Sequence, residues 1–387
     1  MKARAVIGSN YGDEGKGLIT DYLCHKYESD IVVRSNGGAQ AGHTVETPKG
    51  DRHVFGHFSS GFFNGATTYL SKYFVANPFL FWKEYHILSK YRLDNRVLFD
   101  PRCIITTPYD MLINQMIEDR RGENKHGSCG VGFGETIQRN LDPEYSLYYW
   151  QIRELGLCEK IEEIRKKYFP KRCEELGMIP TEKELSILNS DILMTKFIES
   201  CHDMRDMCGQ GIEKISDLYQ NIIFEGAQGL LLDQDYGQFP HVTRSNTGIK
   251  NILDICEENK IDELDVTYVT RCYTTRHGAG PMDQEILEGQ PIYWNVEDKT
   301  NIPNKYQGTL RFAPLNITTL KESIENDLKH RENKNIKISS GLAVTCIDQL
   351  DDYFDKKSVG KYINDYVGLK NKLIESWGPT RSTILEK

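Results

Sequence analysis

The feature that most constrains the fold is a glycine-rich loop that lies between a short apolar run and an amphipathic segment at the start of the chain. Ala3–Ile7 is apolar, Gly8–Gly17 reads GSNYGDEGKG, and Leu18–Tyr27 carries apolar residues at helical spacing. Asp30–Val33 predicts a second buried strand, which runs into another glycine-rich loop, Asn36–Gly42. A strand, loop, helix and strand in such close succession predict a sheet that binds ligands at its strand ends.

The rest of the chain continues this alternation without internal repeats or low-complexity linkers. We predict an α/β fold, a P-loop-NTPase-like central and mostly parallel sheet flanked by helices, in one domain over residues 1–387. From about 142 to 215 the composition becomes charged and helical, and we interpret this stretch as a helical insertion or cap. Apolar patterning places the further elements at Asn77–Tyr91, Arg96–Phe99, 107–122, Glu154–Lys167, Glu182–Asp206, Asn221–Phe224, Asp265–Thr270 and Ile336–Ile347.

The composition limits the classes of partner. The formal charge is −8, which argues against a broad basic face for nucleic acid. Since no stretch approaches about 18 uninterrupted apolar residues, we expect no membrane span, and the N-terminus lacks the apolar run of a signal peptide. The 10 cysteines include no CxxC pair, which is typical of reduced thiols in the cytoplasm. We therefore expect a cytoplasmic protein that binds small molecules.

The loop Gly8–Gly17 has the residues of a phosphate site. Glycines let backbone N–H groups approach an anion, the helix that follows favours negative charge, and Lys16 adds a mobile cation. The loop departs from the GxxxxGK[ST] pattern, because six residues separate Gly8 from Gly15 and Gly17 stands where Ser or Thr is usual. Without that hydroxyl, Asp13 is the nearest candidate metal ligand. By itself the loop also fits a dinucleotide site or a tight turn.

The second loop ends in Ala-Gly-His-Thr, with His43 directly after Gly42. A histidine at this place can reach a phosphoryl oxygen as a hydrogen-bond donor or as a cation. The alternative is a structural histidine that caps a turn.

Together, the two loops resemble the adenylosuccinate synthetase family, in which GDEGKG is followed by AGHT. Further segments in the same order strengthen the resemblance: Phe224–Gly229 (FEGAQG), Leu231–Asp233 (LLD), Pro240–Thr247 (PHVTRSNT), Tyr273–Pro281 (YTTRHGAGP) and Trp377–Arg381 (WGPTR). The resemblance extends from residue 3 to about residue 381.

The resemblance implies a ligase that uses GTP to phosphorylate O6 of a 6-oxopurine nucleotide, after which the amino group of L-aspartate displaces the phosphate. With IMP as substrate the products are adenylosuccinate, GDP and phosphate. Asp13 is expected to take the proton from purine N1 and to ligate Mg²⁺, while His43 and Lys16 stabilise the transferring phosphoryl group and Gln228 contacts the purine. The resemblance also implies a homodimer with shared active sites.

The same resemblance assigns the remaining binding residues. Those expected to bind GTP are Gly12, Gly15, Lys16, Gly17, Gly42, Thr44, Asp348, Gly378 and Pro379. Those expected to bind the purine monophosphate are Asp13, Ser128, Cys129, Gly130, Arg139, Gln228 and Thr243. Those expected to bind aspartate are Thr275, Arg276 and Arg311, and the metal ligands are Asp13 and the carbonyl of Gly42.

Three departures from the family pattern bear on the substrate. Relatives carry two threonines and an arginine where this chain has Ser128, Cys129 and Val131, and they carry several arginines in the aspartate loop where Arg311 is the clear survivor at Tyr306–Leu315. The guanine-reading segment TCID keeps Asp348 and loses a lysine. These changes leave open a rival substrate, GMP or dGMP, as in phage-type members of the family that make a 2-amino-adenylosuccinate.

Other classes of protein fit less well. A P-loop GTPase or kinase would carry GKS or GKT, which is absent around Lys16, and a catalytically dead nucleotide-binding module would be expected to lose Asp13, Lys16 or His43. A dehydrogenase would carry an acidic ribose ligand at the end of the second strand, where this chain reads Ser-Asn-Gly-Gly.

Overall fold

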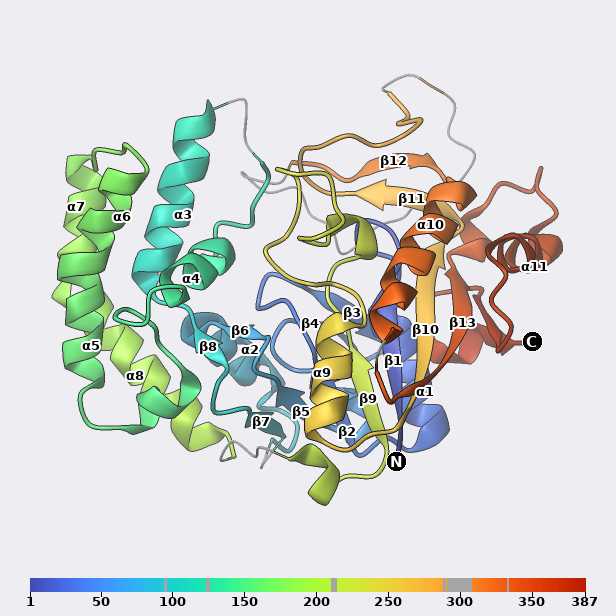
Figure 1. Cartoon of the computed structure of the whole chain (residues 1–387), viewed down its shortest axis with the longest axis horizontal. Helices are drawn as coiled ribbons and strands as arrows, with labels where there is room; N and C mark the ends of the chain where they lie inside the picture. The colour runs from blue at the N-terminus through green and yellow to red at the C-terminus, as the bar shows by residue number, and fades with distance from the viewer. Residues whose placement is uncertain (94–95, 123–125, 210–213, 288–289, 291–307, 333) are drawn as a thin grey trace.

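A parallel sheet runs through the middle of the molecule and carries the loops that make the site (Figure 1). The computed structural model describes residues 1–93, 96–122, 126–209, 214–287, 290, 308–332 and 334–387. Among these residues, nine strands form the main sheet in the order β15-β14-β13-β10-β1-β9-β2-β5-β7. The strands are β1 (Lys2–Gly8), β2 (Ile31–Arg34), β5 (Thr67–Leu70), β7 (Val97–Phe99), β9 (Ile222–Glu225), β10 (Glu263–Arg271), β13 (Lys337–Thr345), β14 (Leu373–Ser376) and β15 (Ile384–Glu386).

All neighbouring pairs in this sheet are parallel except β14 and β15. The central strands are buried along nearly their whole length, which explains why they read as continuous apolar runs in the sequence. The predicted α/β fold with a mostly parallel sheet is therefore confirmed.

Helices cover both faces of the sheet. On one face, Ile19 and Leu23 of α1 (Lys16–Tyr27) pack with Val6 and Val32 of the sheet. On the other face, the apolar sides of three helices pack against the alternate strand residues. These helices are α9 (Lys250–Glu258), α10 (Ile317–Leu328) and α11 (Lys356–Val367).

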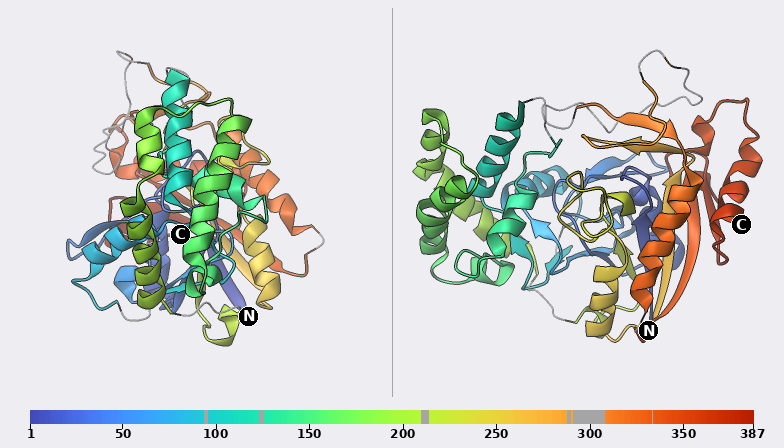
Figure 2. Two further views of the ribbon diagram at one scale, coloured as in Figure 1. Left: turned by 90° about the vertical axis from the view of Figure 1, so that its left-hand side faces the viewer. Right: turned by 45° about the horizontal axis from the view of Figure 1, so that its top comes forward.

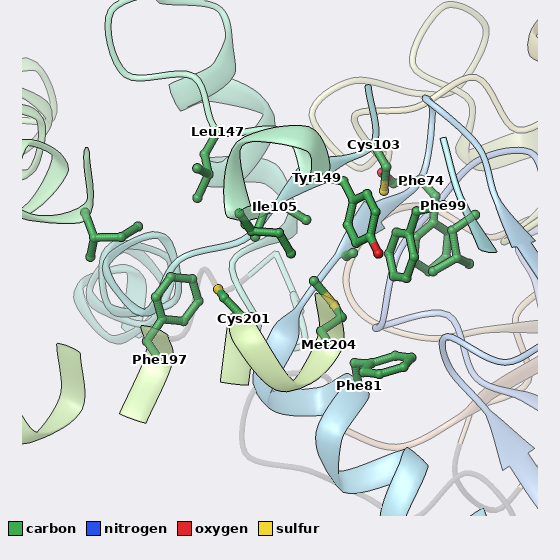
Figure 3. Close-up of a cluster of buried hydrophobic side chains, with 14 of the residues drawn as sticks. Phe74, Phe81, Phe99, Cys103, Ile105, Leu147, Tyr149, Phe197, Cys201 and Met204 are labelled. Atoms are coloured by element: carbon green, nitrogen blue, oxygen red, sulfur yellow. The ribbon is translucent and has the colours of Figure 1, made fainter. Parts of the chain in front are cut away.

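A helical region lies beside β7, at the end of the molecule opposite to the C-terminal elements (Figures 1 and 2). Its helices enclose a separate apolar core, in which the rings of Phe99 and Tyr149 stack with centroids 4.1 Å apart and Phe197 and Met204 of α8 pack nearby (Figure 3). The helices around this core are α2 (Pro78–Leu88), α3 (Pro108–Arg121), α4 (Phe133–Asn140), α5 (Leu157–Glu163), a π-helical turn (Ile164–Tyr168), α6 (Phe169–Glu175), α7 (Glu182–Leu188) and α8 (Asp191–Met207). The interpretation of residues 142–215 as an insertion into a single domain stays a prediction.

The helix predicted over Glu182–Asp206 is wrong in one respect, because it is two helices. α7 ends at Leu188 and α8 begins at Asp191, after Ser190 accepts a hydrogen bond from the backbone of Leu193. A side-chain cap of this kind starts a new helix even where the apolar pattern continues.

Three short two-stranded sheets complete the described fold. The pair β3 (His43–Glu46) and β4 (Arg52–Phe55) and the pair β11 (Tyr273–Arg276) and β12 (Arg311–Pro314) are antiparallel, and the pair β6 (Val75–Ala76) and β8 (Ile104–Ile105) is parallel. All 10 cysteines lie within the described residues and are free, six of them buried. Among the described helices, none has the length and apolar character needed to span a bilayer.

Candidate active site

The carboxyl ends of β1, β2 and β9 carry the glycine-rich loops and the FEGAQG segment. Because parallel strands end at the same edge of a sheet, these three segments meet there. Their backbones turn sharply: Asp13 and Gln228 adopt left-handed conformations, with φ of 61° and 64°, that non-glycine residues rarely take. Such outliers persist only where the surrounding structure holds them, which is typical of functional sites.

The loop Gly8–Gly17 already holds a negative charge. The Glu14 carboxylate accepts hydrogen bonds from the backbone N–H of Asn10 at 3.0 Å and of Gly12 at 2.8 Å, and from Lys16 Nζ at 2.6 Å. Lys16 is only 4% exposed. Two backbone donors and an ammonium thus converge on one anion, which is the arrangement that a phosphate requires.

Two positions in and around this loop have no room for a side chain. A Cβ on Gly8 would lie 2.4 Å from Glu14 Oε2. A Cβ on Gly17 would lie 2.5 Å from the backbone oxygen of Thr44, where α1 packs against β3. The close approach of β3 therefore explains why Gly17 stands where a phosphate loop usually has Ser or Thr.

His43 is held by a buried carboxylate that sequence reasoning did not identify as a site residue. Its Nδ1 lies 2.8 Å from Oε1 of Glu225, which is fully buried and also accepts hydrogen bonds from the N–H and hydroxyl of Ser60. The guanidinium of Arg34 lies 3.8 Å away. The signal in the sequence was the glutamate of FEGAQG, a charged residue at the end of a strand that is otherwise apolar.

The electrostatics of this pair determine which nitrogen of His43 is bonded to Glu225 and which is available to a ligand. Burial lowers the pKa of His43, against the raising effect of Glu225. Burial alone would raise the pKa of Glu225, yet His43 and Arg34 lower it to about 2, so this carboxylate stays ionised. An ionised Glu225 accepts Nδ1–H, and the buried Nε2 has no hydrogen-bond partner among the described residues. That nitrogen is therefore the one available to a ligand.

Asp13 lies where three loops meet. Its carbonyl accepts a hydrogen bond from Arg271 Nε, and its Oδ2 lies 3.6 Å from Nε2 of His277. Burial, with the charge of Asp13 as the second cause, raises the pKa of the Cys129 thiol to about 11. Asp13 is therefore close to the Gly127–Gly130 loop and to the YTTRHGAGP segment.

The Gly127–Gly130 loop has the form of an anion cradle. Gly127 and Gly130 have φ of 81° and 70°, and Ser128 Oγ accepts a hydrogen bond of 2.9 Å from Asn114. The loop leads into the N-terminus of α4, whose dipole favours an anion. Thr243, expected to share this site, is 9% exposed.

Arg139 departs from its predicted role. Its side chain is fully buried and donates to both carboxylate oxygens of Asp110 and to the carbonyls of Ile105 and Tyr145. All three guanidinium nitrogens donate inside the protein, and the fully buried side chain presents no surface to a substrate phosphate or to a partner subunit. The expectation that Arg139 binds the phosphate is therefore not met in this structure.

Arg276 and Arg311 are opposite each other in the β11–β12 ladder, and their expected role in binding aspartate stays a prediction. Arg276 is 1% exposed, donates to the carbonyls of Pro281 and His241, and stacks 4.3 Å from the ring of Tyr11. Arg311 pairs with Glu285 and donates to the carbonyls of Gly278 and Gly280. Thr275 is buried beside them. Residues 306–307 of the aspartate loop lie outside the described residues.

The segments expected to bind guanine lie close to the glycine-rich loop. Asp348 lies in a short 3-10 turn after β13, and burial raises its pKa. Thr345 donates a 2.7 Å hydrogen bond to the carbonyl of Glu14, and a Cβ on Gly15 would lie 3.2 Å from its methyl group. Gly378 and Pro379 connect β14 to the C-terminal turn, where Ser376 Oγ donates to the Gly378 carbonyl.

The oxygen donors proposed for a metal fit Mg²⁺. Asp13 offers a partly exposed carboxylate and Gly42 an exposed backbone carbonyl. Within the described part of the chain there is no cluster of three or more His, Cys, Asp or Glu side chains arranged to hold a metal. Mg²⁺ accepts a donor set of one carboxylate, one carbonyl and the phosphates of the substrate. Zn²⁺ usually takes three or four protein ligands.

Comparison with known proteins gives a consistent result. The family model for adenylosuccinate synthetase matches residues 5–308. The adenylosuccinate synthetase of Borrelia turicatae is 30% identical over 98% of this chain and 86% of its own length, and that of Lactobacillus acidophilus is 33% identical over 92% and 79%.

Two solved structures share the fold. The fully ligated adenylosuccinate synthetase of Plasmodium falciparum has a TM-score of 0.73 at 17% identity and covers 99% of both chains. The cyanophage S-2L succinoaminodeoxyadenylate synthetase, bound to dGMP and to dATP as an energy donor, has a TM-score of 0.62 at 15% identity and covers 99% of this chain and 95% of its own.

Proposed function

The chain belongs to the adenylosuccinate synthetase family and is a ligase that forms a C–N bond, and on this premise we propose that it joins L-aspartate to IMP. GTP donates the phosphoryl group, and the products are adenylosuccinate, GDP and phosphate. We propose that it does so in the cytoplasm, as a homodimer, a point that sedimentation would check.

The observation that carries this proposal is the pairing of His43 with Glu225 beside an anion cradle. Glu225 occupies Nδ1 of His43 and leaves Nε2 without a partner, while Lys16 and two backbone N–H groups already surround a carboxylate. Preorganised donors around the place where charge develops are the main means of catalysing phosphoryl transfer.

In the first step, Asp13 takes the proton from purine N1. The electron pair moves to O6, which attacks the γ-phosphorus of GTP, and the bond from that phosphorus to the β–γ bridging oxygen breaks. GDP leaves with that oxygen, while Lys16 and Nε2 of His43 stabilise the phosphoryl oxygens. Because Lys16 and His43 are buried, each of these interactions is stronger than it would be in water.

In the second step, the amino group of L-aspartate attacks C6 of the purine. The bond between C6 and O6 breaks, and inorganic phosphate leaves with O6. Arg276 and Arg311 are proposed to hold the aspartate carboxylates, because two adjacent cations match a dicarboxylate. Both must exchange carbonyl or Glu285 contacts for those of the substrate.

A bound Mg²⁺ would supply charge neutralisation for the phosphates, with Asp13 and the Gly42 carbonyl as its protein ligands.

A second candidate keeps this chemistry and replaces IMP by GMP or dGMP. The observation that favours it is that Val131 and the buried Arg139 offer no cation to the substrate phosphate, and that Arg311 is engaged by Glu285. These residues lie where the phosphate and ribose of the substrate are expected to bind. Changes there alter the choice of nucleotide more than the phosphoryl transfer or the attack by aspartate.

One assay separates the candidates. The protein is incubated with GTP, Mg²⁺, L-aspartate and each of IMP, dIMP, GMP and dGMP, and GDP release and product mass are followed. We expect turnover with IMP. Turnover with dGMP alone would show that the second candidate is the function. If no purine nucleotide leads to GDP release, the protein is not a ligase of this type.

A further inference from the structure

Asp13 has to present its carboxylate to purine N1 in one orientation, yet its own backbone fixes only part of that geometry. The left-handed φ of 61° and the hydrogen bond from Arg271 Nε to its carbonyl hold the main chain. The carboxylate itself remains partly exposed, with 26% of the side-chain surface accessible. His277 Nε2 lies 3.6 Å from Oδ2, and the charge of Asp13 also acts on Arg271 and on the Cys129 thiol.

His277 lies on a segment that is itself held firmly. It follows Arg276, whose backbone is paired with that of Arg311 in the β11–β12 ladder. On its other side Gly278 packs so closely against Gly127 that a Cβ on Gly127 would lie 2.7 Å from Gly278 Cα. The backbone on both sides of His277, at Arg276 and Gly278, therefore holds the imidazole next to Asp13.

Within the described part of the chain, the imidazole ring has no other polar partner that would explain its position. Its Nδ1 is buried and has no hydrogen-bond partner among the described residues, and the side chain is 19% exposed. Burying a polar nitrogen without a hydrogen-bond partner lowers the stability of the fold. If the ring only filled space, an apolar side chain could take its place with no loss of stability. The remaining nitrogen, Nε2, is directed at Asp13.

We propose that His277 is a positioning residue for Asp13: its Nε2–H binds Oδ2 and leaves Oδ1 turned to the purine N1 proton. This inference rests on the proposed function, in which Asp13 is the base. The separation of 3.6 Å is longer than a hydrogen bond. Such contacts are often long in unliganded enzymes and shorten when the substrate binds.

The test uses three substitutions that differ in where they leave a donor. His277→Gln places an amide near the position of Nε2, His277→Asn places it near Nδ1, and His277→Leu removes both. We expect His277→Leu and His277→Asn to lower kcat by ~10-fold or more with KM for IMP and GTP unchanged, the scale for misplacing a catalytic group. His277→Gln should recover most of the rate.

A double-mutant cycle with Asp13→Ala separates positioning from a structural role. If His277 acts through Asp13, His277→Leu lowers the residual kcat of Asp13→Ala no further, since the two residues act as a unit. Multiplicative losses would overturn the proposal, and so would equal rates for the Gln and Asn variants. Thermal unfolding of each variant checks that the fold survives, and the Gln–Asn comparison decides if His277→Leu does not fold.

The outcomes distinguish this inference from the function on which it rests. If wild type and all three His277 variants turn over at the same rate, the inference about His277 is wrong and the ligase function is still supported. No turnover by wild type with any purine removes both.

Discussion

The two halves of the site differ in how far they are assembled before any substrate binds. In the half proposed to handle the phosphoryl group, Lys16, His43 and Glu225 are each at most 6% exposed, and His43 Nε2 has no hydrogen-bond partner among the described residues. In the half expected to bind aspartate, Arg276 and Arg311 are engaged by carbonyls and by Glu285. In the first half Lys16 must exchange Glu14 for a phosphate while His43 keeps Glu225, whereas in the second half both cations must exchange partners.

The origin of each half explains the difference. In the phosphoryl half, Glu225 ends β9 of the main sheet and Lys16 follows the loop from β1; His43 begins the two-stranded β3–β4 pair but is tied to the main sheet by its contact with Glu225. The aspartate half lies on the two-stranded β11–β12 sheet and on the loops that follow it. Two-stranded units are marginally stable by themselves, so a change of contacts costs less there.

The largest effect is expected in the phosphoryl half. Asp13→Ala and His43→Ala should each lower kcat by at least ~100-fold, the scale for losing an acid–base or electrostatic group. Steady-state GDP release with IMP and aspartate measures this, with thermal unfolding as a control for the fold. A near-normal rate for either variant would refute the role assigned to that residue.

A second prediction concerns the carboxylate behind His43. Glu225→Gln keeps an acceptor for Nδ1–H but removes the charge that balances Arg34. We expect kcat to fall by about 10-fold, and the free energy of unfolding by ~3 kcal/mol, because Arg34 is left as a buried uncompensated charge. Urea unfolding and GDP release are the measurements. Unchanged kcat with reduced stability would make Glu225 a structural residue only.

Arg311 gives a prediction for the other half. Arg311→Leu should raise KM for L-aspartate at least ~10-fold while KM for GTP stays the same, since a lost charged hydrogen bond is worth roughly 1.5–3 kcal/mol. Glu285→Gln is the matched control: it releases Arg311 from its ion pair and should change KM for aspartate less than Arg311→Leu does. If KM for GTP rises in parallel, the two halves are not separate.

The smallest predicted effect is on stability, at Asp327 of α10. Asp327 is buried and accepts hydrogen bonds from the backbone of Ile249 and from Tyr268, and burial raises its pKa to about 7. Because the folded-state pKa lies above the unfolded value of 3.8, the stability contributed by the protonated form is full below that value and is lost as pH rises through about 7. Asp327→Asn should therefore flatten the pH dependence of the unfolding free energy between these limits. The same slope in both proteins would show that Asp327 does not titrate there.

Much of the phosphoryl half could be predicted from the sequence, and less of the aspartate half. The mostly parallel sheet was predicted correctly from its apolar strands, and the glycine-rich loop lies between β1 and α1 as expected, while its phosphate-binding role stays a prediction. Arg139 was misassigned because spacing along the chain cannot show that Asp110, itself part of the N-terminal cap of α3, would bind its guanidinium. Glu225 was overlooked because a lone acidic residue in an apolar strand shows its partner only after folding.

The measurement that tests the central claim most directly is isotope exchange within GTP. GTP carrying heavy oxygen in the β–γ bridge is incubated with IMP and Mg²⁺ in the absence of aspartate. If the phosphoryl half is complete by itself, the phosphoryl group moves reversibly to O6, and the β-phosphate of the bound GDP can rotate before the group returns. The label then moves into non-bridging positions of the β-phosphate. We expect this exchange in wild type and in Arg311→Leu but not in His43→Ala. Exchange that requires aspartate, or that Arg311→Leu abolishes, would contradict the division of the site into two independent halves.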